Sequence, residues 1–358
     1  MEYLVNNFYD GCCIDVGPSS LLIDFGSQQR KQVKNNKGFF QTRFRDKLLI
    51  SHYHTDHYNK LFDLKKRSIL INELIYPYIP LIDSKEMKDE KTLKKMIVFY
   101  NILSIFSETG VPSCGLIKLL KDKCAENFTP RNVKMGDRIS IIGDTYDVIW
   151  PPKEISHVNC SIKLVSGIKK IMSVIKKDDV ITKFWDKFER EFRNKNYEND
   201  EDLENYEFEQ EEFKKINPLI KKELSKEIRN ITNRLSICLY KEDKFLFLGD
   251  LEKEEISCCI DYLKKNYYLN HVKYLIAPHH GTHWHDRLLD IYAENLIISN
   301  GKKMIVNYKE QFNRIAGNIH HTYMSGDIRF CDGYGCRCYF LPLAHTVRRP
   351  IILGDCRT

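Results

Sequence analysis

A dense group of histidine and aspartate side chains follows the apolar segment Lys47–Ile50. The segment Ser51–His57 reads SHYHTDH, so that three histidines and one aspartate fall within six residues. Imidazole nitrogen and carboxylate oxygen are preferred ligands of zinc and similar divalent cations, and a loop at a strand end can turn several side chains toward one point. A chance cluster of surface histidines is the alternative, but this density of metal-binding side chains favours a metal site.

Two later segments end in the same kinds of side chain. KFLFLGD delivers Asp250 at the end of an apolar run, and VKYLIAPHH delivers His279 and His280 in the same way. Asp250 alone would most often be a turn residue or a helix N-cap, and the two histidines alone are equally compatible with a structural role. All three segments follow apolar strands, however, so their combination predicts one metal site in which Asp250 bridges two cations.

These motifs, in this order, resemble the metallo-β-lactamase fold superfamily, whose signature is H-x-H-x-D-H followed by a bridging aspartate and a last histidine. Within it, the chain is similar to the soluble hydrolase domain of the competence protein ComEC and to related stand-alone hydrolases. The supporting segments are Asp10-Gly11 with LLIDFG, then SHYHTDH, NRLS, FLGD, PHHGT and HHTYMSGDIRF. The likeness covers most of the chain apart from two helical stretches. It implies an α/β protein with the four-layer αββα sandwich of that superfamily.

The resemblance also implies which residues hold the metals. His52 and His54 would bind the first ion, Asp56, His57 and His280 the second, and Asp250 would bridge them. Many family members have a further histidine for the first ion, and Asn233 occupies that point here, as in the ComEC-like branch. An amide oxygen is a harder and weaker ligand than imidazole, so this site would be looser. We expect two divalent cations, zinc or manganese, with magnesium as an alternative, and His157 as a second candidate for the ligand.

Asp24, in LLIDFG, occupies a position that lies beside the metal site in the family. There a buried carboxylate orients a ligating histidine through its second ring nitrogen. A plain turn residue at the end of the strand is the alternative reading of Asp24.

Such a centre would hydrolyse its substrate with a metal-bridging hydroxide, a mechanism that suits phosphodiesters. Asp56 or Asp250 would orient the hydroxide. The leaving group needs a proton, and histidine titrates near neutral pH. His283 and His321, and also His285, are candidates for this general acid, although each could equally be a surface or structural histidine. The resemblance places three hydroxyl side chains where they could bind substrate oxygens, and ordinary turn chemistry is the alternative for them: Thr282, Thr322 and Ser325.

Apolar patterning predicts the elements that position these side chains. Strands are expected in CCIDV, SSLLIDFG, KLLIS, DRISIIG, YDVIWPP, LSICLY, KFLFLGD, VKYLIAP, ENLIIS, GDIRF and CRCYFLPL. Helical spacing is found in the stretch 84–124, from Leu251 to about Lys265, and in a charged stretch, 163–231, where Trp185, Phe188 and Phe192 repeat on one face and Pro218 interrupts. We therefore expect one hydrolase domain over residues 1–358 with a helical and acidic insertion at 163–231.

The charge distribution favours an anionic substrate. The segment Glu198–Glu212 holds nine acidic and no basic residues, so the rest of the chain has 40 acidic against 56 basic residues, a net charge of +16. Lysine and arginine attract phosphates independently of sequence. We expect a nuclease or phosphodiesterase acting on nucleic acid or a nucleotide. Two alternatives remain, a small-molecule ester, lactone or phosphoester hydrolase of the same fold and a non-catalytic protein that keeps a structural metal.

The acidic run could imitate nucleic acid or be a solvated loop, and the insertion could bind a regulatory protein or a second copy of the chain.

Composition sets the remaining expectations. The chain of 358 residues is 42% hydrophobic and 29% charged, which excludes collagen-like and wholly disordered classes. No run approaches about 18 consecutive apolar residues, and the first residues lack a signal-peptide pattern. We therefore expect a cytoplasmic protein without a membrane span, whose twelve cysteines are reduced thiols. The C-terminal set Cys331, Cys336, Cys338 and Cys356 could bind zinc, although ordinary buried thiols fit these strand segments better.

Overall fold

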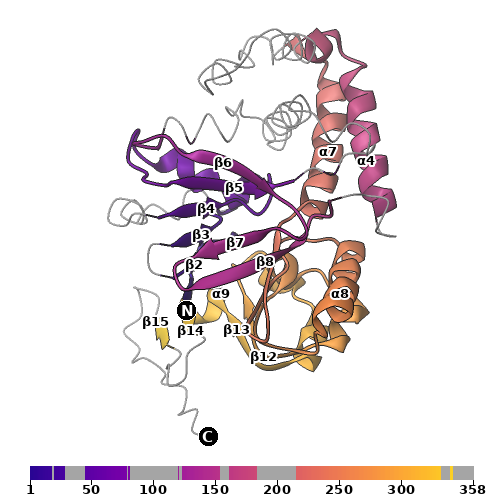
Figure 1. Ribbon diagram of the computed structural model, residues 1–358. Coiled ribbons are helices and arrows are strands. Elements are labelled where there is room, and N and C mark those ends of the chain that lie inside the picture. Colours follow the sequence, from indigo (N-terminus) through magenta and orange to yellow (C-terminus); the bar gives the residue numbers. More distant parts are fainter. Residues whose placement is uncertain are drawn as a thin grey trace, which may run out of the picture.

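The chain was analysed as a computed structural model, which describes residues 1–17, 20–28, 45–78, 80, 120, 123–153, 161–183, 215–331 and 339–341. Within these residues the strands form two mixed sheets, joined by a few helices, in an α/β arrangement (Figure 1). The first sheet has the order β15-β14-β1-β2-β3-β4-β5-β6. The second has the order β13-β12-β11-β10-β9-β8-β7.

The strands are short and follow the apolar segments of the sequence. In the first sheet they are β1 (Glu2–Val5), β2 (Ile14–Val16), β3 (Leu21–Ile23), β4 (Lys47–Leu49), β5 (Glu73–Pro77), β6 (Thr129–Val133), β14 (Asp327–Cys331) and β15 (Tyr339–Leu341). In the second they are β7 (Arg138–Ile141), β8 (Asp144–Trp150), β9 (Cys238–Lys241), β10 (Phe245–Phe247), β11 (His271–Ile276), β12 (Tyr292–Ile298) and β13 (Ala316–His321). The predicted strands are confirmed in position where the chain is described.

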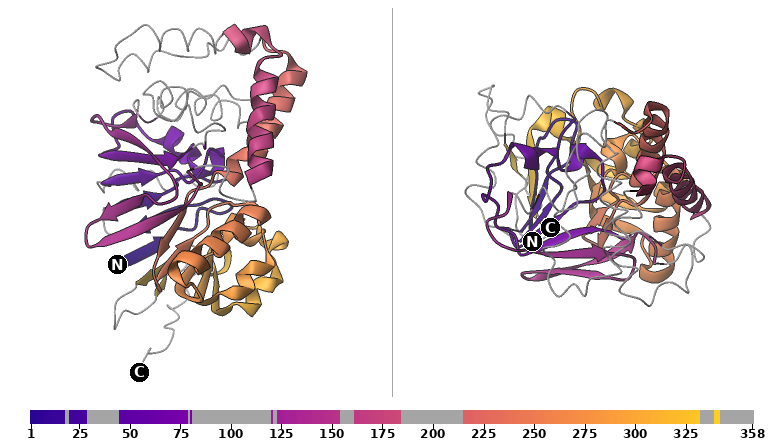
Figure 2. Two further views of the ribbon diagram at one scale, coloured as in Figure 1. Left: turned by 45° about the vertical axis from the view of Figure 1, so that its right-hand side comes forward. Right: turned by 90° about the horizontal axis from the view of Figure 1, so that it is seen from above.

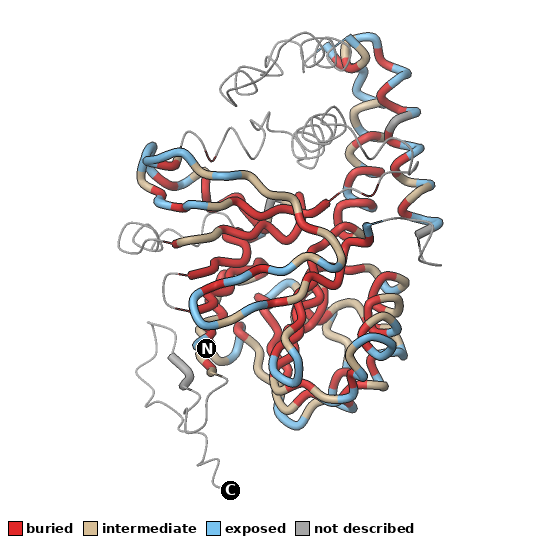
Figure 3. Tube along the Cα trace, in the orientation of Figure 1, coloured by how far each residue is buried: buried red, intermediate tan, exposed pale blue. Residues whose placement is uncertain are grey.

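The two sheets pack face to face through a buried apolar cluster. Alternate residues of a strand point to opposite faces, and β3 illustrates the result. Leu21 and Ile23 join the cluster between the sheets, while Leu22 points into a second cluster on the outer face. In the other sheet, Phe245 and Phe247 of β10 face the same central cluster. Central strands buried on both faces read as continuous apolar runs, which is why LLI and FLF predicted strands. All six residues are buried, and Figure 3 shows the inner strands of the first sheet in the colour of buried residues.

Helices cover the outer faces of both sheets. The helices α4 (Ser161–Ile175) and α7 (Pro218–Arg234) pair with each other and contribute to the outer cluster of the first sheet. The helix α8 (Lys253–Tyr267) buries Ile256, Ile260 and Leu263 against the second sheet. In Figure 2, α4 and α7 run side by side beyond the sheets, while α8 lies along the second sheet. The short helix α9 (Thr322–Ser325) follows β13.

The helix predicted from Leu251 to about Lys265 is confirmed as α8, shifted by two residues. The helical character predicted for the stretch 163–231 is found at its two ends, in α4 and α7, and its being an insertion stays a prediction. Pro218 begins α7 instead of interrupting a helix, because the Asn217 side chain caps the N-terminus and proline fits the first turn. Most of the helical stretch 84–124 lies outside the described residues, as do the acidic run Glu198–Glu212, the Trp185, Phe188 and Phe192 face, His157, and Cys336, Cys338 and Cys356.

Four described strands were not predicted, namely β1, β5, β6 and β13. The expectation of reduced thiols also needs correction. Cys12, Cys13, Cys124, Cys238 and Cys259 are free and buried, but Cys258 and Cys331 are disulfide-bonded.

Within the described part of the chain, no helix has both the length and the apolarity required to cross a membrane.

Candidate metal centre

The candidate site lies where parallel strands of both sheets end. In the first sheet β3 and β4 run parallel, and in the second β10, β11, β12 and β13 run parallel in succession. Carboxyl ends of parallel strands meet at one edge of a sheet, where ligand sites form. Asp24 follows β3, the segment Ser51–His57 follows β4, Asp250 follows β10, and His280 follows β11.

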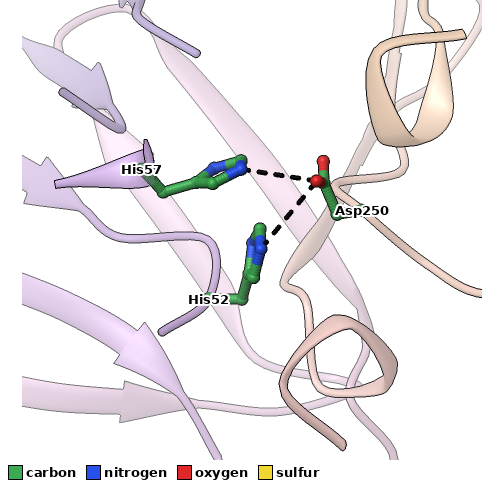
Figure 4. Close-up of side chains that lie close together, drawn as sticks. All are labelled: His52, His57 and Asp250. Atoms are coloured by element: carbon green, nitrogen blue, oxygen red, sulfur yellow. Dashed lines mark ion pairs between the residues drawn. The ribbon is translucent and has the colours of Figure 1, made fainter. Parts of the chain in front are cut away.

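Four imidazole rings converge on the Asp250 carboxylate. The distances to Asp250 Oδ2 are 3.4 Å from His57 Nε2, 3.6 Å from His280 Nε2, 3.7 Å from His279 Nε2 and 3.9 Å from His52 Nε2. Figure 4 shows His52 and His57, which lie in the loop after β4, pointing toward Asp250, which follows β10 of the other sheet. The structure therefore brings together residues that are nearly 200 positions apart in the sequence and come from both sheets.

The ring nitrogens that face this point lack hydrogen-bond partners. Among the described residues, the buried Nε2 atoms of His52, His57 and His280 face Asp250 without a hydrogen-bond partner, and the buried Nε2 of the neighbouring His54 also has none. A buried polar nitrogen without a partner costs about 1–3 kcal/mol, and a cation at the common point would satisfy several of them together. The chemistry of the donor set, imidazole with carboxylate, fits a divalent cation of the zinc class. These residues are therefore able to hold metal.

The opposite ring nitrogens are pinned by the surrounding structure. His280 Nδ1 donates to the Ser299 carbonyl oxygen at 2.7 Å, and His57 Nδ1 lies 2.8 Å from Asp24 Oδ2. His52 Nδ1 lies 3.1 Å from Ser51 Oγ, which itself donates to Asp24. A proton on Nδ1 leaves the Nε2 lone pair directed at Asp250. This is the arrangement by which an outer carboxylate or carbonyl fixes the tautomer of a metal-ligating histidine.

Asp24 organises the loop after β4 from a fully buried position. Its Oδ1 accepts from the Ser51 backbone N–H at 2.7 Å, and its Oδ2 accepts from the Ser51 hydroxyl at 2.7 Å in addition to His57. This geometry is the one that a role in orienting a ligand requires. Asp24 also has a φ of 57°, in the left-handed region that non-glycine residues adopt at a cost of roughly 1–2 kcal/mol, and strain of this kind gathers at functional sites.

The described metal-binding side chains form three groups whose ligand atoms lie within 4.8 Å of one another. They are His52–His57–Asp250, Asp56–His57–His280 and Glu252–His279–His283. The second group has the same members as the predicted second ion's set, apart from the bridging Asp250. The first replaces the predicted partner His54 with His57. The His54 ring stands edge-on to His52 at 4.9 Å, outside these groups.

Burial and neighbouring charges shift the pKa values of the cluster in different directions. Burial lowers the pKa of His52 well below its usual value and also lowers that of His54, which the Arg229 guanidinium reinforces. Burial opposes ionisation of Asp250, but His280 and His57 hold its pKa well below the usual range. In His57 the Asp24 and Asp250 carboxylates overcome burial and raise the pKa well above 6.5. The Asp250 carboxylate is therefore ionised, the His52 and His54 rings are neutral, and the His57 ring carries a proton that a bound cation would displace.

Asn233, the predicted substitute ligand, lies at the C-terminal end of α7. Its Nδ2 donates to Glu252 Oε1 at 3.0 Å, whereas its Oδ1 is buried without a partner. The amide nitrogen thus points to Glu252, and a ligand role for the oxygen remains a prediction.

The candidate general acids occupy different surroundings. His321 ends β13, with its Nδ1 3.1 Å from the Asn300 amide nitrogen and its ring edge-on to Tyr308. Burial lowers the pKa of His321. His283 Nδ1 lies 2.9 Å from His279 Nδ1 and 3.0 Å from the Leu251 carbonyl. His285 accepts from the Arg287 backbone N–H and caps a short 3-10 helix, Asp286–Asp290, so its ring has a structural role.

The predicted substrate-binding hydroxyls are mostly engaged with the backbone. Thr282 Oγ1 donates to the His279 carbonyl at 2.7 Å. Thr322 is fully buried; its hydroxyl accepts from the Asn300 N–H and lies 2.9 Å from the Asn300 carbonyl. Both hydroxyls therefore hold the loops beside the centre. Ser325 is half-buried at the end of α9.

Sequence reasoning missed Glu252, gave Ser51 no role, and named His279 without assigning its ring a partner. The histidine doublet in PHH was visible but gave no indication of which ring faces which group. A family-model scan found no match to this chain, and a search of curated proteins found none either.

Proposed function

We propose that the protein is a metal-dependent hydrolase with two divalent cations, zinc or manganese, and that it cleaves phosphodiesters. The observation that carries the proposal is the convergence of buried, unpaired Nε2 atoms on Asp250 Oδ2. The two packed sheets with helices outside support a further proposal, that the fold is the αββα sandwich of the metallo-β-lactamase superfamily. The H-x-H-x-D-H motif directly after β4 supports the same assignment.

In this proposal the two ions share the side chains around Asp250. His52 and His54 would hold the first ion, Asp56, His57 and His280 would hold the second, and Asp250 would serve both. When bound, two such cations lower the pKa of a water molecule and stabilise the attacking and leaving oxygens of an in-line displacement. No serine or cysteine nucleophile is needed. Asp56 lies at the rim, where Gln28 Nε2 donates to its Oδ2 at 3.1 Å.

We propose that His321 delivers a proton to the leaving group, and its hydrogen bonding and its strand register support this role. The Asn300 amide nitrogen, at 3.1 Å, donates to His321 Nδ1, which puts the ring proton on Nε2. The register of β12 and β13 pairs Ile298 with His321, so the ring ends at the same sheet edge as Ser299, the residue that holds His280. A neutral ring with a defined Nε2–H can act as the general acid.

Basic side chains next to the centre favour a phosphodiester over a neutral ester. Lys302 and Lys303 are exposed on the loop after Asn300, and Asp10 fixes that loop by accepting from the backbone N–H groups of Gly301 and Lys303. Arg229, on α7, is exposed and close enough to His54 to affect its pKa. Exposed cationic groups of this kind attract a phosphate backbone.

A hydrolysis panel tests the proposal. Metal-stripped protein is reloaded with zinc, manganese or magnesium and assayed on single- and double-stranded DNA, RNA, bis-p-nitrophenyl phosphate and a lactone. We expect metal-dependent cleavage of phosphodiesters that Asp56→Ala and His280→Ala abolish. His271→Ala is the matched control, because His271 begins β11 at the opposite edge of the sheet and pairs with Glu294. Cleavage of the lactone alone would contradict the substrate assignment, and inactivity with every metal and substrate would contradict the hydrolase.

A further inference from the structure

A third group of metal-binding side chains stands beside the Asp250 cluster. Glu252, His279 and His283 have ligand atoms within 4.8 Å of one another, and none of the three belongs to the other two groups. His283 Nδ1 lies 2.9 Å from His279 Nδ1 and 3.7 Å from Glu252 Oε2. Two histidines and one carboxylate are a donor set that zinc and other divalent transition metals use in proteins.

We propose that Glu252, His279 and His283 form a third divalent-cation site, separate from the two ions around Asp250. The His279 ring joins the two sites. Its Nε2 lies 3.7 Å from Asp250 Oδ2, while its Nδ1, on the other edge of the ring, faces His283. A cation held by Nδ1 would therefore stand on the far side of this ring from Asp250.

The two rings and a neighbouring carbonyl share a single proton, which a cation could replace. The two Nδ1 atoms face each other at 2.9 Å, so only one of them can carry the proton between them. The Leu251 carbonyl, 3.0 Å from His283 Nδ1, competes for that same proton. A cation in place of the proton would accept both nitrogen lone pairs, and the carbonyl oxygen could join them as a fourth ligand.

The surrounding structure holds the three side chains in place. Asn233 Nδ2 donates to Glu252 Oε1, which leaves Oε2 toward His283. The His279 backbone N–H donates to the Gly249 carbonyl, and the Thr282 hydroxyl donates to the His279 carbonyl. His279 has a φ of 47°, so this ring is presented by a left-handed backbone conformation that non-glycine residues seldom adopt. Strain of this kind persists where the surroundings impose it.

The site is open to solvent on one side. The side chains of His279 and His283 are each 20% exposed and that of Glu252 is 27% exposed. A cation here would keep coordination positions for water or for an oxygen of an anionic ligand, whereas the rings of His52 and His57 are fully enclosed. His283 is then a metal ligand, which leaves His321 as the general acid of the proposed reaction.

The test is a zinc count by equilibrium dialysis and elemental analysis of wild-type protein, His283→Ala, Glu252→Gln and His285→Asn. Glutamine keeps an oxygen for Asn233, and asparagine at position 285 keeps a cap for the 3-10 helix. We expect the wild type and His285→Asn to bind about one more zinc per chain than His283→Ala and Glu252→Gln. Circular dichroism and urea midpoints verify that all four proteins are folded.

Equal zinc counts in the four proteins would overturn the inference. The difference between variants does not depend on how many ions bind around Asp250. An inactive wild-type protein that still loses one zinc with His283→Ala would refute the hydrolase and retain the third site. Anomalous scattering at the zinc edge gives a direct position, and density next to His279 Nδ1 is expected.

Discussion

Replacing Asp24 by asparagine separates the role of this carboxylate in orienting His57 from its role in holding the loop. Asparagine has almost the same shape, and its Oδ1 can still accept from the Ser51 backbone N–H. The amide nitrogen would replace Oδ2, which lies 2.8 Å from His57 Nδ1. A donor at that point forces Nδ1 to accept, so the ring proton moves to Nε2 and occupies the lone pair that faces Asp250.

The expected magnitude follows from the number of interactions changed. Loss of an outer carboxylate on a metal-ligating histidine typically costs 10- to 100-fold in metal affinity, which is about 1.4–2.7 kcal/mol. The metal-free protein also loses a charged hydrogen bond to a fully buried imidazole, worth about 1.5–3 kcal/mol of folding free energy. Zinc affinity is measured by competition with a chromophoric chelator, and stability by urea unfolding of the metal-free protein.

Asp10→Asn is the matched control for this substitution. Asp10 is equally buried, but its carboxylate accepts from the backbone N–H groups of Gly301, Lys303 and Met304. It should lower stability and leave zinc affinity within about threefold, or roughly 0.7 kcal/mol, of the wild type. If folded Asp24→Asn also stays within that range, His57 is not a ligand oriented by Asp24, and the reasoning fails.

Three further predictions test the pH dependence, the packing and the charges around the site. Because Asp24 and Asp250 overcome burial and raise the pKa of His57 well above 6.5, the charged ring stabilises the metal-free fold below about pH 6.5 and this contribution is lost as the pH rises through the raised pKa. Zinc binding at pH 7 should therefore release about one proton from this ring. The heat of zinc binding is measured by calorimetry in buffers of different ionisation enthalpy, and a heat that does not depend on the buffer would refute the prediction. In Gly26→Ala the new Cβ would lie 2.2 Å from the Asp56 carbonyl oxygen and 2.6 Å from the His57 backbone nitrogen, so we expect about a tenfold or greater loss of zinc affinity. Gly143→Ala, whose Cβ meets nothing within 4 Å, serves as the control. Unchanged zinc affinity in Gly26→Ala would contradict the close packing of Gly26 against the loop. The Arg45–Asp15 ion pair is buried, with its atoms 2.6 Å apart. Arg45→Met should therefore lower the free energy of unfolding by about 3–5 kcal/mol, and the double variant Asp15→Leu with Arg45→Met should lower it considerably less. Urea unfolding measures both values, and equal losses in the two variants would be evidence against an uncompensated charge in Arg45→Met.

The sequence predicted the central strands because burial on both faces leaves a clear signal. The runs LLI, KLL and FLF became β3, β4 and β10. Two of the missed strands, β6 and β13, lack that signal, whereas β5, ELIYP, has four buried residues and was overlooked. β6, TPRNV, has only Val133 fully buried, and β13, AGNIHH, has no buried residue and lies at the edge of its sheet. Such strands form because a neighbouring strand offers its hydrogen bonds, a tertiary effect that overrides local preference.

In the candidate site, too, some residues could be predicted from the sequence and others could not. The segment SHYHTDH, Asp250 and His280 could be found because each follows an apolar strand, and parallel strands bring their ends together. The third group could not be found. His279 and His280 have φ values of 47° and 57°, and nothing local in PHHG favours a left-handed backbone at two histidines. That conformation decides which way each ring faces, so it decides that His279 meets His283 and Glu252.

The predicted insertion leads into the candidate site through the last turn of its helix α7. Its helix α7 ends in Asn233 and Arg234, and these two residues hold the segment that follows Asp250. Asn233 donates to Glu252, and Arg234 Nη1 lies 2.6 Å and 2.7 Å from the two oxygens of Glu255, a carboxyl whose pKa burial raises to about 7. The Trp150 indole N–H donates to the Arg234 carbonyl and fixes the same helix end to β8. Since one carboxylate of the third group depends on the last turn of α7, the position of this helix and the geometry of that group are physically coupled.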